Sequence, residues 1–504
     1  MLTHSNVPAT RIRVFNDRPD HICGSGAFVL YWMISARRTK WNFGLQRAVD
    51  WAIELGKPLL VLEALRATYP WNCERFHAFV IEGMADNARD FASTPVTYYP
   101  YLEPEPGKEK GLLKELARDA CVVISDDFPC FFLPRMVEAA SRQLRVRLEL
   151  IDSNGLYPMR HTNRVFSRAF DFRRHLQKEL LPHLTQQPLA NPLTGKILRS
   201  LPRLESIPAT ILKRWPAADP LALTRDRTTL QQALGRFQID HSVGIVETVG
   251  GSSAANQRAA DFIKRKLSRY SEERNEPQKE MSSGLSPYLH FGHLSVHQLF
   301  DTTSRQVGWT AEQVAAKPTG QSSGWWGAPE VESFWDELIT WRELGYNMCA
   351  NSDDYDQYES LPDWARKTLA EHETDPRPFV YSLEEFENSR THDPLWNAAQ
   401  YQLVTTGVIH NYLRMLWGKK ILEWSPNART ALSTMIELNN KWAIDGRNPN
   451  SYSGIFWVLG RYDRAWNERE IFGKIRYMSS DNTARKYHVK EYIRRFNPKT
   501  PTLF

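Results

Sequence analysis

The chain has 504 residues, 42% hydrophobic and 24% charged, which is enough for two to four domains with cores of their own and excludes a wholly disordered or collagen-like chain. No window approaches the ~18 apolar residues that a membrane helix needs, so we expect no membrane span. The formal net charge is +6, but residues 441–504 alone carry 13 Lys and Arg against 6 Asp and Glu. A basic C-terminal segment on an otherwise neutral chain favours a polyanion, such as nucleic acid, as the binding partner.

Residues 20–155 alternate between strand and helix patterns and predict an α/β domain with a doubly wound parallel sheet. Several of its strand candidates are apolar on both faces, as buried parallel strands are. The expected strands are 27–33, 58–65, 95–102, 121–127 and 147–152, and the expected helices are 43–56, 110–120 and 133–144. No GxGxxG follows the first strand, so the dinucleotide fingerprint is absent.

Residues 156–240 are expected to be an interdomain linker, because repeated prolines between 186 and 240 oppose helices and central strands. From 241 to 496 the apolar residues recur three and four apart, which predicts an all-α domain. Five scattered cysteines without CxxC or zinc spacing indicate reduced thiols, no metal site and a cytoplasmic protein. The N-terminus has no signal-peptide pattern.

Twelve of the 17 tryptophans lie within residues 309–466. Trp417 and Trp424 are seven residues apart, so they project in similar directions from one helix. Arg414 precedes them, and if it is buried it needs a carboxylate. Asp445 is a candidate for that carboxylate, although the sequence alone does not pair the two.

Four segments in this region resemble the photolyase/cryptochrome flavoproteins, most closely the class II cyclobutane pyrimidine dimer photolyases. They are YSEERNEP (270–277) with SSGLSPYLHFGHLS (282–295), WDELITWRELGYNM (335–348), THDPLWNAAQ (391–400) with LRMLWGKKILEW (413–424), and the stretch from LNNKWAIDGRNPN (438–450) through YDRAW (462–466). Each is weak alone, but four in matching order are specific. The chain departs from the class II pattern by an apparent insertion at 321–329 and by one residue fewer before YDRAW.

The resemblance implies an N-terminal α/β domain joined by a long linker to an all-α FAD-binding domain. It implies light-driven repair of ultraviolet-damaged DNA, in which photoexcited reduced FAD gives an electron to a flipped-out dimer. It leaves open a second, antenna chromophore of deazaflavin or folate type. The family expectation is a monomer, associated with the nucleoid if the source is bacterial.

The resemblance also assigns roles to individual residues. For FAD it implies Tyr270, Ser282, Ser283, Gly284, Leu285, Ser286, Arg414, Asn439 and Asp445. For the lesion pocket it implies Glu337, Trp341, Met415, Trp457 and Asn275. Trp417, Trp396 and Trp424 match the family's electron-transfer chain. Separately, Arg461, Arg464, Lys474 and Arg476 lie beside the pocket motif within the basic C-terminal segment and are expected to position DNA phosphates.

Three alternatives remain at this point. A cryptochrome-like photoreceptor would keep the flavin without repair, and retention of Glu337, Met415 and both pocket tryptophans argues against it. An enzyme for the other ultraviolet photoproduct needs a pair of pocket histidines, which His290 and His410 do not match. A plain DNA-binding module would not need FAD.

Overall fold

The computed structural model describes residues 5–16, 18, 21–196, 198–199 and 207–498. The chain forms two compact units. Unit 1 comprises 1–162, 180–259 and 285–302, and unit 2 comprises 163–179, 260–284 and 303–504. This division differs from the predicted boundaries at 155 and 240, because most of the expected linker belongs to unit 1. Asp20, where the predicted α/β domain begins, lies outside the described residues.

Unit 1 is built on a six-stranded sheet in the order β1-β6-β5-β2-β3-β4. All neighbours are parallel except β1, which pairs antiparallel with β6 (Ile12 with Ile151). The predicted doubly wound sheet is thus confirmed, with a short antiparallel edge strand added. The strands are β1 (Ile12–Val14), β2 (Phe28–Met33), β3 (Leu59–Leu65), β4 (Thr97–Leu102), β5 (Ala120–Asp126) and β6 (Leu148–Ile151).

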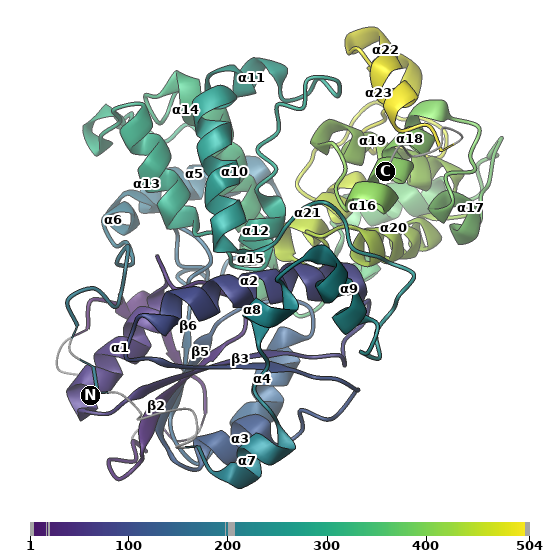
Figure 1. Cartoon of the computed structure of the whole chain (residues 1–504). Coiled ribbons are helices and arrows are strands. Elements are labelled where there is room, and N and C mark those ends of the chain that lie inside the picture. The colour runs from purple at the N-terminus through teal and green to yellow at the C-terminus, as the bar shows by residue number, and fades with distance from the viewer. Residues whose placement is uncertain (1–4, 17, 19–20, 197, 200–206, 499–504) are drawn as a thin grey trace. The chain divides into compact units, whose positions relative to one another are not determined.

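Helices cover both faces of this sheet, as Figure 1 shows for α1 and α2 on one side and α3, α4 and α7 on the other. Successive residues of β2 therefore enter two different cores. Leu30 and Trp32 pack in the core that includes Leu116 of α3, whereas Val29 and Tyr31 pack with Phe43 and Leu45 of α1. Because both faces are buried, every residue of β2 is buried. The helices are α1 (Phe43–Leu55), α2 (Glu74–Ala92), α3 (Leu112–Ala117), α4 (Leu133–Ser141), α6 (Leu181–Leu184), α12 (Ser286–His290) and the 3-10 helix η1 (Ala9–Arg11).

Within residues 207–240 of the expected linker, three short helices pack on unit 1. They are α7 (Ala209–Arg214), α8 (Pro220–Leu223) and α9 (Arg227–Leu234). Trp215 is 2% exposed in the core that holds Leu30, and Asp219 and Asp226 cap α8 and α9 through their side chains. The prolines punctuate this segment without making it a free connection.

Regular secondary structure in the described part of unit 2 is helical, so the all-α prediction is confirmed. Its helices are α5 (Ala169–Glu179), α11 (Tyr270–Glu273), α14 (Pro329–Trp335), η5 (Asp336–Trp341), α15 (Arg342–Asn351), α16 (Asp363–Glu371), α17 (Leu383–Glu387), α18 (Pro394–Thr406), α19 (Asn411–Trp424), α20 (Ala428–Trp442), α21 (Pro449–Val458), α22 (Ser480–Lys486) and α23 (Lys490–Arg495), with short 3-10 turns η3 (Leu267–Arg269), η4 (Ala311–Gln313) and η6 (Tyr358–Ser360). The unit boundaries fall within α10 (Gly251–Arg265) and α13 (Val296–Gln306). None of the described helices is long and apolar enough to cross a membrane.

Two glycines bring helices of unit 2 close together. A Cβ on Gly345 of α15 would lie 2.6 Å from the Pro449 carbonyl oxygen of α21, and one on Gly418 of α19 would lie 2.5 Å from a Val458 methyl group. Only a residue without a side chain permits these approaches. Helices α15 and α19 therefore both pack directly on α21.

Candidate functional site

Glu337 and Trp341 lie in a π-helical segment, η5, between helices α14 and α15. Hydrogen bonds from i to i+5 are rare, and single turns of this kind occur frequently at functional sites. Both side chains are half-buried, whereas Leu338, Ile339 and Thr340 between them are buried. The segment thus keeps the two predicted lesion residues accessible while their neighbours fill the core.

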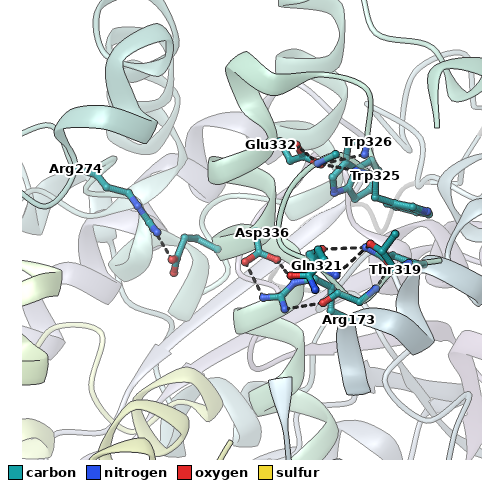
Figure 2. A network of polar contacts seen from close by, with 12 residues as sticks. Arg173, Arg274, Thr319, Gln321, Trp325, Trp326, Glu332 and Asp336 are labelled. Atoms are coloured by element: carbon teal, nitrogen blue, oxygen red, sulfur yellow. Dashed lines mark hydrogen bonds and ion pairs between the residues drawn. The ribbon is translucent and has the colours of Figure 1, made fainter. Parts of the chain in front are cut away.

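Two arginines from elsewhere in the chain hold the first turn of this segment. Arg173 of α5 forms a two-pronged ion pair with Asp336, with Nε–Oδ1 and Nη2–Oδ2 distances of 2.7 and 2.9 Å. Glu337 pairs with Arg274. Figure 2 shows Arg173 directed at Asp336, with Arg274 also reaching toward this helix. Burial raises the pKa of Glu337, and the charge of Arg274 opposes that rise.

The pair with Arg274 links two of the predicted lesion residues that are far apart in sequence. Arg274 immediately precedes Asn275, so its contact with Glu337 brings the Asn275 backbone near η5. The guanidinium also lies 5.5 Å from the ring centroid of Tyr270. Sequence reasoning missed Arg274, although its position beside Asn275 was an available signal.

The insertion at 321–329 is fastened to α14 just before η5. The Glu332 carboxylate accepts hydrogen bonds from the backbone N–H groups of Gly324, Trp325 and Trp326 at 2.7, 2.9 and 3.1 Å (Figure 2). These bonds fix the loop to the helix that leads into η5.

Met415 of α19 and Trp457 of α21 are also half-buried, and their helices pack on each other. Helix α15 directly follows η5 and also packs on α21. The helices that carry Glu337, Trp341, Met415 and Trp457 therefore belong to one packed group. All five members of the set, Asn275 included, are half-buried. Partial exposure leaves each of these side chains accessible to a ligand.

Arg414 and Asp445 form the ion pair that the sequence left open, with Arg414 Nη2 lying 3.0 and 3.3 Å from the two carboxylate oxygens. Within the described residues, Nη1 and Nε of Arg414 have no hydrogen-bond acceptor, so the guanidinium retains donors for a further group. Asn439 is 3% exposed, and its amide nitrogen donates to Asn440 at 3.3 Å. This donor set suits the polar edge of a flavin ring.

The predicted phosphate-binding residues are divided between the units. Tyr270, Ser282, Ser283 and Gly284 belong to unit 2. Tyr270 is 9% exposed, and burial raises its pKa to about 12, so its hydroxyl is a neutral hydrogen-bond donor. Gly284 has φ of +66°, a left-handed conformation that favours glycine. Leu285 and Ser286 belong to unit 1, and their roles stay predictions.

The three tryptophans of the predicted electron chain are all buried, at 0% exposure for Trp396 and 3% for Trp417 and Trp424. Trp396 donates its Nε1–H to the Trp417 carbonyl at 3.0 Å, and its ring lies 6.0 Å from that of Trp424. Trp417 donates to Gln400 at 2.8 Å. Trp396 thus contacts the backbone of Trp417 and lies beside the Trp424 ring, and the redox role of the three residues stays a prediction.

Trp424 does not itself reach the surface. Its ring lies 5.7 Å from Tyr381 and 4.9 Å from His392, of which His392 is exposed. If Trp424 were oxidised, an electron from outside the protein would therefore have to reach it through Tyr381 or His392. Sequence spacing gave no indication of it.

The predicted phosphate contacts separate into two kinds. Arg464 and Lys474 are exposed, and Arg476 is half-buried in a two-pronged pair with Asp463 at 2.7 and 3.0 Å. Burial alone would raise the pKa of Asp463, but the hydrogen bonds and charge of Arg476 bring it below its ordinary range.

Arg461 is a correction to the sequence prediction. Its side chain is buried, with 2% of the residue exposed. It donates to the Tyr355 carbonyl at 3.0 Å and to the Ser360 hydroxyl. A guanidinium enclosed in this way holds the segment that contains Tyr355 and Ser360 and is not available to a DNA phosphate.

Sequence comparison shows that the chain is similar to several proteins named deoxyribodipyrimidine photo-lyase. A deoxyribodipyrimidine photo-lyase from Methanothermobacter thermautotrophicus is 34% identical over 489 residues, covering 97% of this chain and 98% of its own. The enzyme of the same name from Oryza sativa is 31% identical, covering 93% of this chain and 87% of its own. No protein-family model matches the sequence.

Solved structures show the same fold at lower sequence identity. A class III photolyase from Agrobacterium tumefaciens superimposes with a TM-score of 0.63 at 17% identity, covering 94% of this chain and 86% of its own. A Synechocystis cryptochrome gives a TM-score of 0.63 at 15% identity, covering 94% and 88%. Both likenesses concern the fold alone.

Proposed function

Since the chain belongs to the deoxyribodipyrimidine photo-lyase family, we propose that it is a light-driven DNA repair enzyme that binds FAD and splits cyclobutane pyrimidine dimers. The observation that best supports a pyrimidine dimer as the substrate is the ion pair between Arg274 and Glu337. It gathers Asn275, Glu337 and Trp341 around one π-helical turn. These half-buried residues offer hydrogen-bond partners and an aromatic surface to a base that has left the helix.

The residues of unit 2 fit a flavin. Arg414 keeps unused guanidinium donors beside its partner Asp445, and Asn439 adds a buried amide. Tyr270, Ser282 and Ser283 supply hydroxyl groups suited to phosphates. When bound and reduced, FAD supplies the photoexcited electron that opens the dimer ring.

The chain's own residues then orient the substrate. Glu337, when ionised, accepts a hydrogen bond from a thymine N3–H, and when protonated it donates to a carbonyl oxygen. Its raised pKa makes the protonated form easier to reach. Trp341 and Trp457 supply stacking surfaces for extruded bases, and Met415 fills the space between irregular surfaces.

The electron chain and the DNA contacts complete the proposal. Trp417, Trp396 and Trp424 return a lost electron to the cofactor by short hops between indoles. Arg464, Lys474 and Arg476 neutralise phosphates and so position the duplex without reading its sequence. An antenna chromophore and a monomeric state remain predictions.

One experiment tests the substrate and the light dependence together. Reduced holoprotein is incubated with an oligonucleotide containing one cyclobutane dimer, in blue light and in darkness, and the repaired strand is quantified by chromatography. A matched oligonucleotide with the other pyrimidine photoproduct is the specificity control. We expect repair of the dimer in light only. FAD binding without repair of either lesion would contradict the proposal and favour a photoreceptor.

A further inference from the structure

Lys419 of α19 is a fully buried lysine, with 0% of the residue exposed. Its ammonium donates to the Val458 carbonyl at 2.6 Å and lies 4.8 Å from the ring centroid of Trp457. Among the described residues no carboxylate lies within ion-pair distance of it. The adjacent Lys420 is different, because its ammonium pairs with Glu423 at 2.6 Å and lies over Trp424.

The close packing at Gly418 puts Lys419 in this place. A Cβ at Gly418 would meet a Val458 methyl group at 2.5 Å and the Met435 sulfur at 3.2 Å. Without a side chain at position 418, α19 approaches α21 closely enough for the next residue to reach across to the Val458 carbonyl and the Trp457 ring. The contact is therefore built into the helix packing.

A buried ammonium is costly unless its charge is compensated. Here a neutral carbonyl and an aromatic ring provide that compensation, and burial lowers the pKa of Lys419 to about 7. Two other charged groups act on it, Asp463, which raises the pKa, and Arg476, which lowers it. Helices α18 and α20, which also pack on α19, contribute no charged group that acts on this ammonium within the described residues.

Lys419 is the buried end of a row in which cations and indoles alternate. Arg476 lies 5.6 Å from the Trp457 ring and 4.1 Å from the Trp466 ring, and Arg464 lies 5.1 Å from Trp466. Trp466 is 37% exposed. The row thus runs from the core to the surface where phosphate contacts are expected. Trp457 has one cation within 6 Å from α19 and another from the segment between α21 and α22.

We propose that Lys419 is a positioning residue for the lesion: its buried ammonium, fixed by the Val458 carbonyl, holds the Trp457 ring in place and so strengthens binding of a dimer relative to undamaged DNA. This inference rests on the proposed function, since it takes Trp457 as a surface for the extruded dimer. Undamaged duplex contacts the phosphate-binding residues but leaves no base on Trp457. Lys419 therefore affects the preference for damage more than the affinity for DNA in general.

A cation–π contact requires a cation, so the preference should depend on the protonation of Lys419. As pH rises through about 7, the ammonium becomes neutral and the contact with the ring is lost. A change that acts only on the phosphate contacts alters the affinity for damaged and undamaged DNA alike. The preference is expressed as the dissociation constant for undamaged DNA divided by that for dimer DNA. Comparison of wild type with Lys419→Met separates the effect of Lys419 from that of Glu337, whose pKa burial raises.

The test measures binding in darkness, at fixed salt, for an oligonucleotide with one cyclobutane dimer and for its undamaged counterpart, between about pH 6 and pH 8. In the wild-type holoprotein the ratio should fall by roughly 2- to 30-fold over this range, the span expected for one cation–π contact. Lys419→Met keeps the length of the side chain without the charge, and it should show the low ratio at every pH. Lys420→Met, the matched control on the same helix, should behave as wild type.

Three results would overturn the inference. They are a wild-type ratio that does not change with pH, a wild-type ratio in folded Lys419→Met, and loss of the pH dependence in Lys420→Met. If Lys419→Met does not fold, the wild-type pH series is compared with that of Glu337→Gln, which should retain the pH dependence that Lys419 causes. Absence of any preference for the dimer at every pH would overturn both this inference and the proposed function, whereas a preference independent of pH overturns only the inference.

Discussion

Breaking the ion pair between Arg173 and Asp336 should strongly destabilise unit 2, because both side chains are largely buried and little solvent can replace either partner. Both side chains are 11% exposed, and the two N–O distances are 2.7 and 2.9 Å. Arg173→Met preserves most of the aliphatic volume but leaves a buried carboxylate without its partner. Loss of one member of such a pair costs about 3–5 kcal/mol.

A second arginine of the same chain segment provides a matched control. Arg168 forms an ion pair of nearly the same geometry with Asp171, at 2.7 and 3.1 Å, but its side chain is 59% exposed. Because solvent screens that pair, Arg168→Met should change the free energy of unfolding by less than about 1 kcal/mol. The two variants differ mainly in the burial of the ion pair.

Urea unfolding of the holoprotein, followed by tryptophan fluorescence, gives both free energies. Arg173→Met should also weaken binding of dimer-containing DNA, because Asp336 is the residue before Glu337 and fixes the start of η5. Equal destabilisation by the two variants would refute the reasoning, since it would show that burial of the pair does not determine its contribution.

Three further predictions concern the lesion, the tryptophans and the DNA contacts. Glu337→Gln, which changes the donor and acceptor character, should lower the repair yield per absorbed photon while FAD content stays normal; an unchanged yield would remove Glu337 from the mechanism. Trp417→Phe should slow photoreduction of the oxidised holoprotein, yet the chemically reduced variant should still repair dimers; photoreduction at the wild-type rate would indicate a packing role. Replacing Arg464 or Lys474 with Met should reduce the log–log salt slope of DNA binding by about one each, whereas Arg461→Met should lower stability and leave that slope unchanged.

The strands and the doubly wound sheet could be predicted because their signal is local. Runs such as 28–33 are apolar at every position, and that pattern requires a strand buried on both faces. The edge strand β1 has only three residues, Ile12–Val14, with a polar residue in the middle. Its antiparallel pairing with β6 depends on a contact 139 residues away (Ile12 with Ile151), which no local pattern contains.

The candidate site was predictable as a set of residues but not as a network of contacts. Arg414 was expected to need a carboxylate, and the structure supplies Asp445. The partnership of Arg274 with Glu337 joins positions 63 residues apart, and it follows from the way α11 packs on α14. Neighbouring lysines 419 and 420 look alike in the sequence, and only the packing at Gly418 distinguishes the unpaired ammonium from the paired one.

Arg461 shows the opposite limitation. Its place in a basic segment favoured a phosphate contact, because charge counted along a sequence does not distinguish the surface from the interior. In the fold, the guanidinium satisfies the Tyr355 carbonyl and the Ser360 hydroxyl. Composition therefore gives the sign of the partner's charge, whereas burial decides which cations meet it.

The π-helical segment makes the site sensitive to the winding of one turn as well as to its chemistry. Each residue of an α-helix turns the chain by about 100°, and an i→i+5 turn holds about one residue more than an α-helical turn, so re-forming Asp336–Trp341 as an α-helix with no residue deleted would rotate everything before it by about that angle relative to α15. Glu337 would then turn relative to Trp341, and its contact with Arg274 would be lost. Loss of the wide turn is thus equivalent to changing several pocket contacts at once, although every side chain that makes them would still be present.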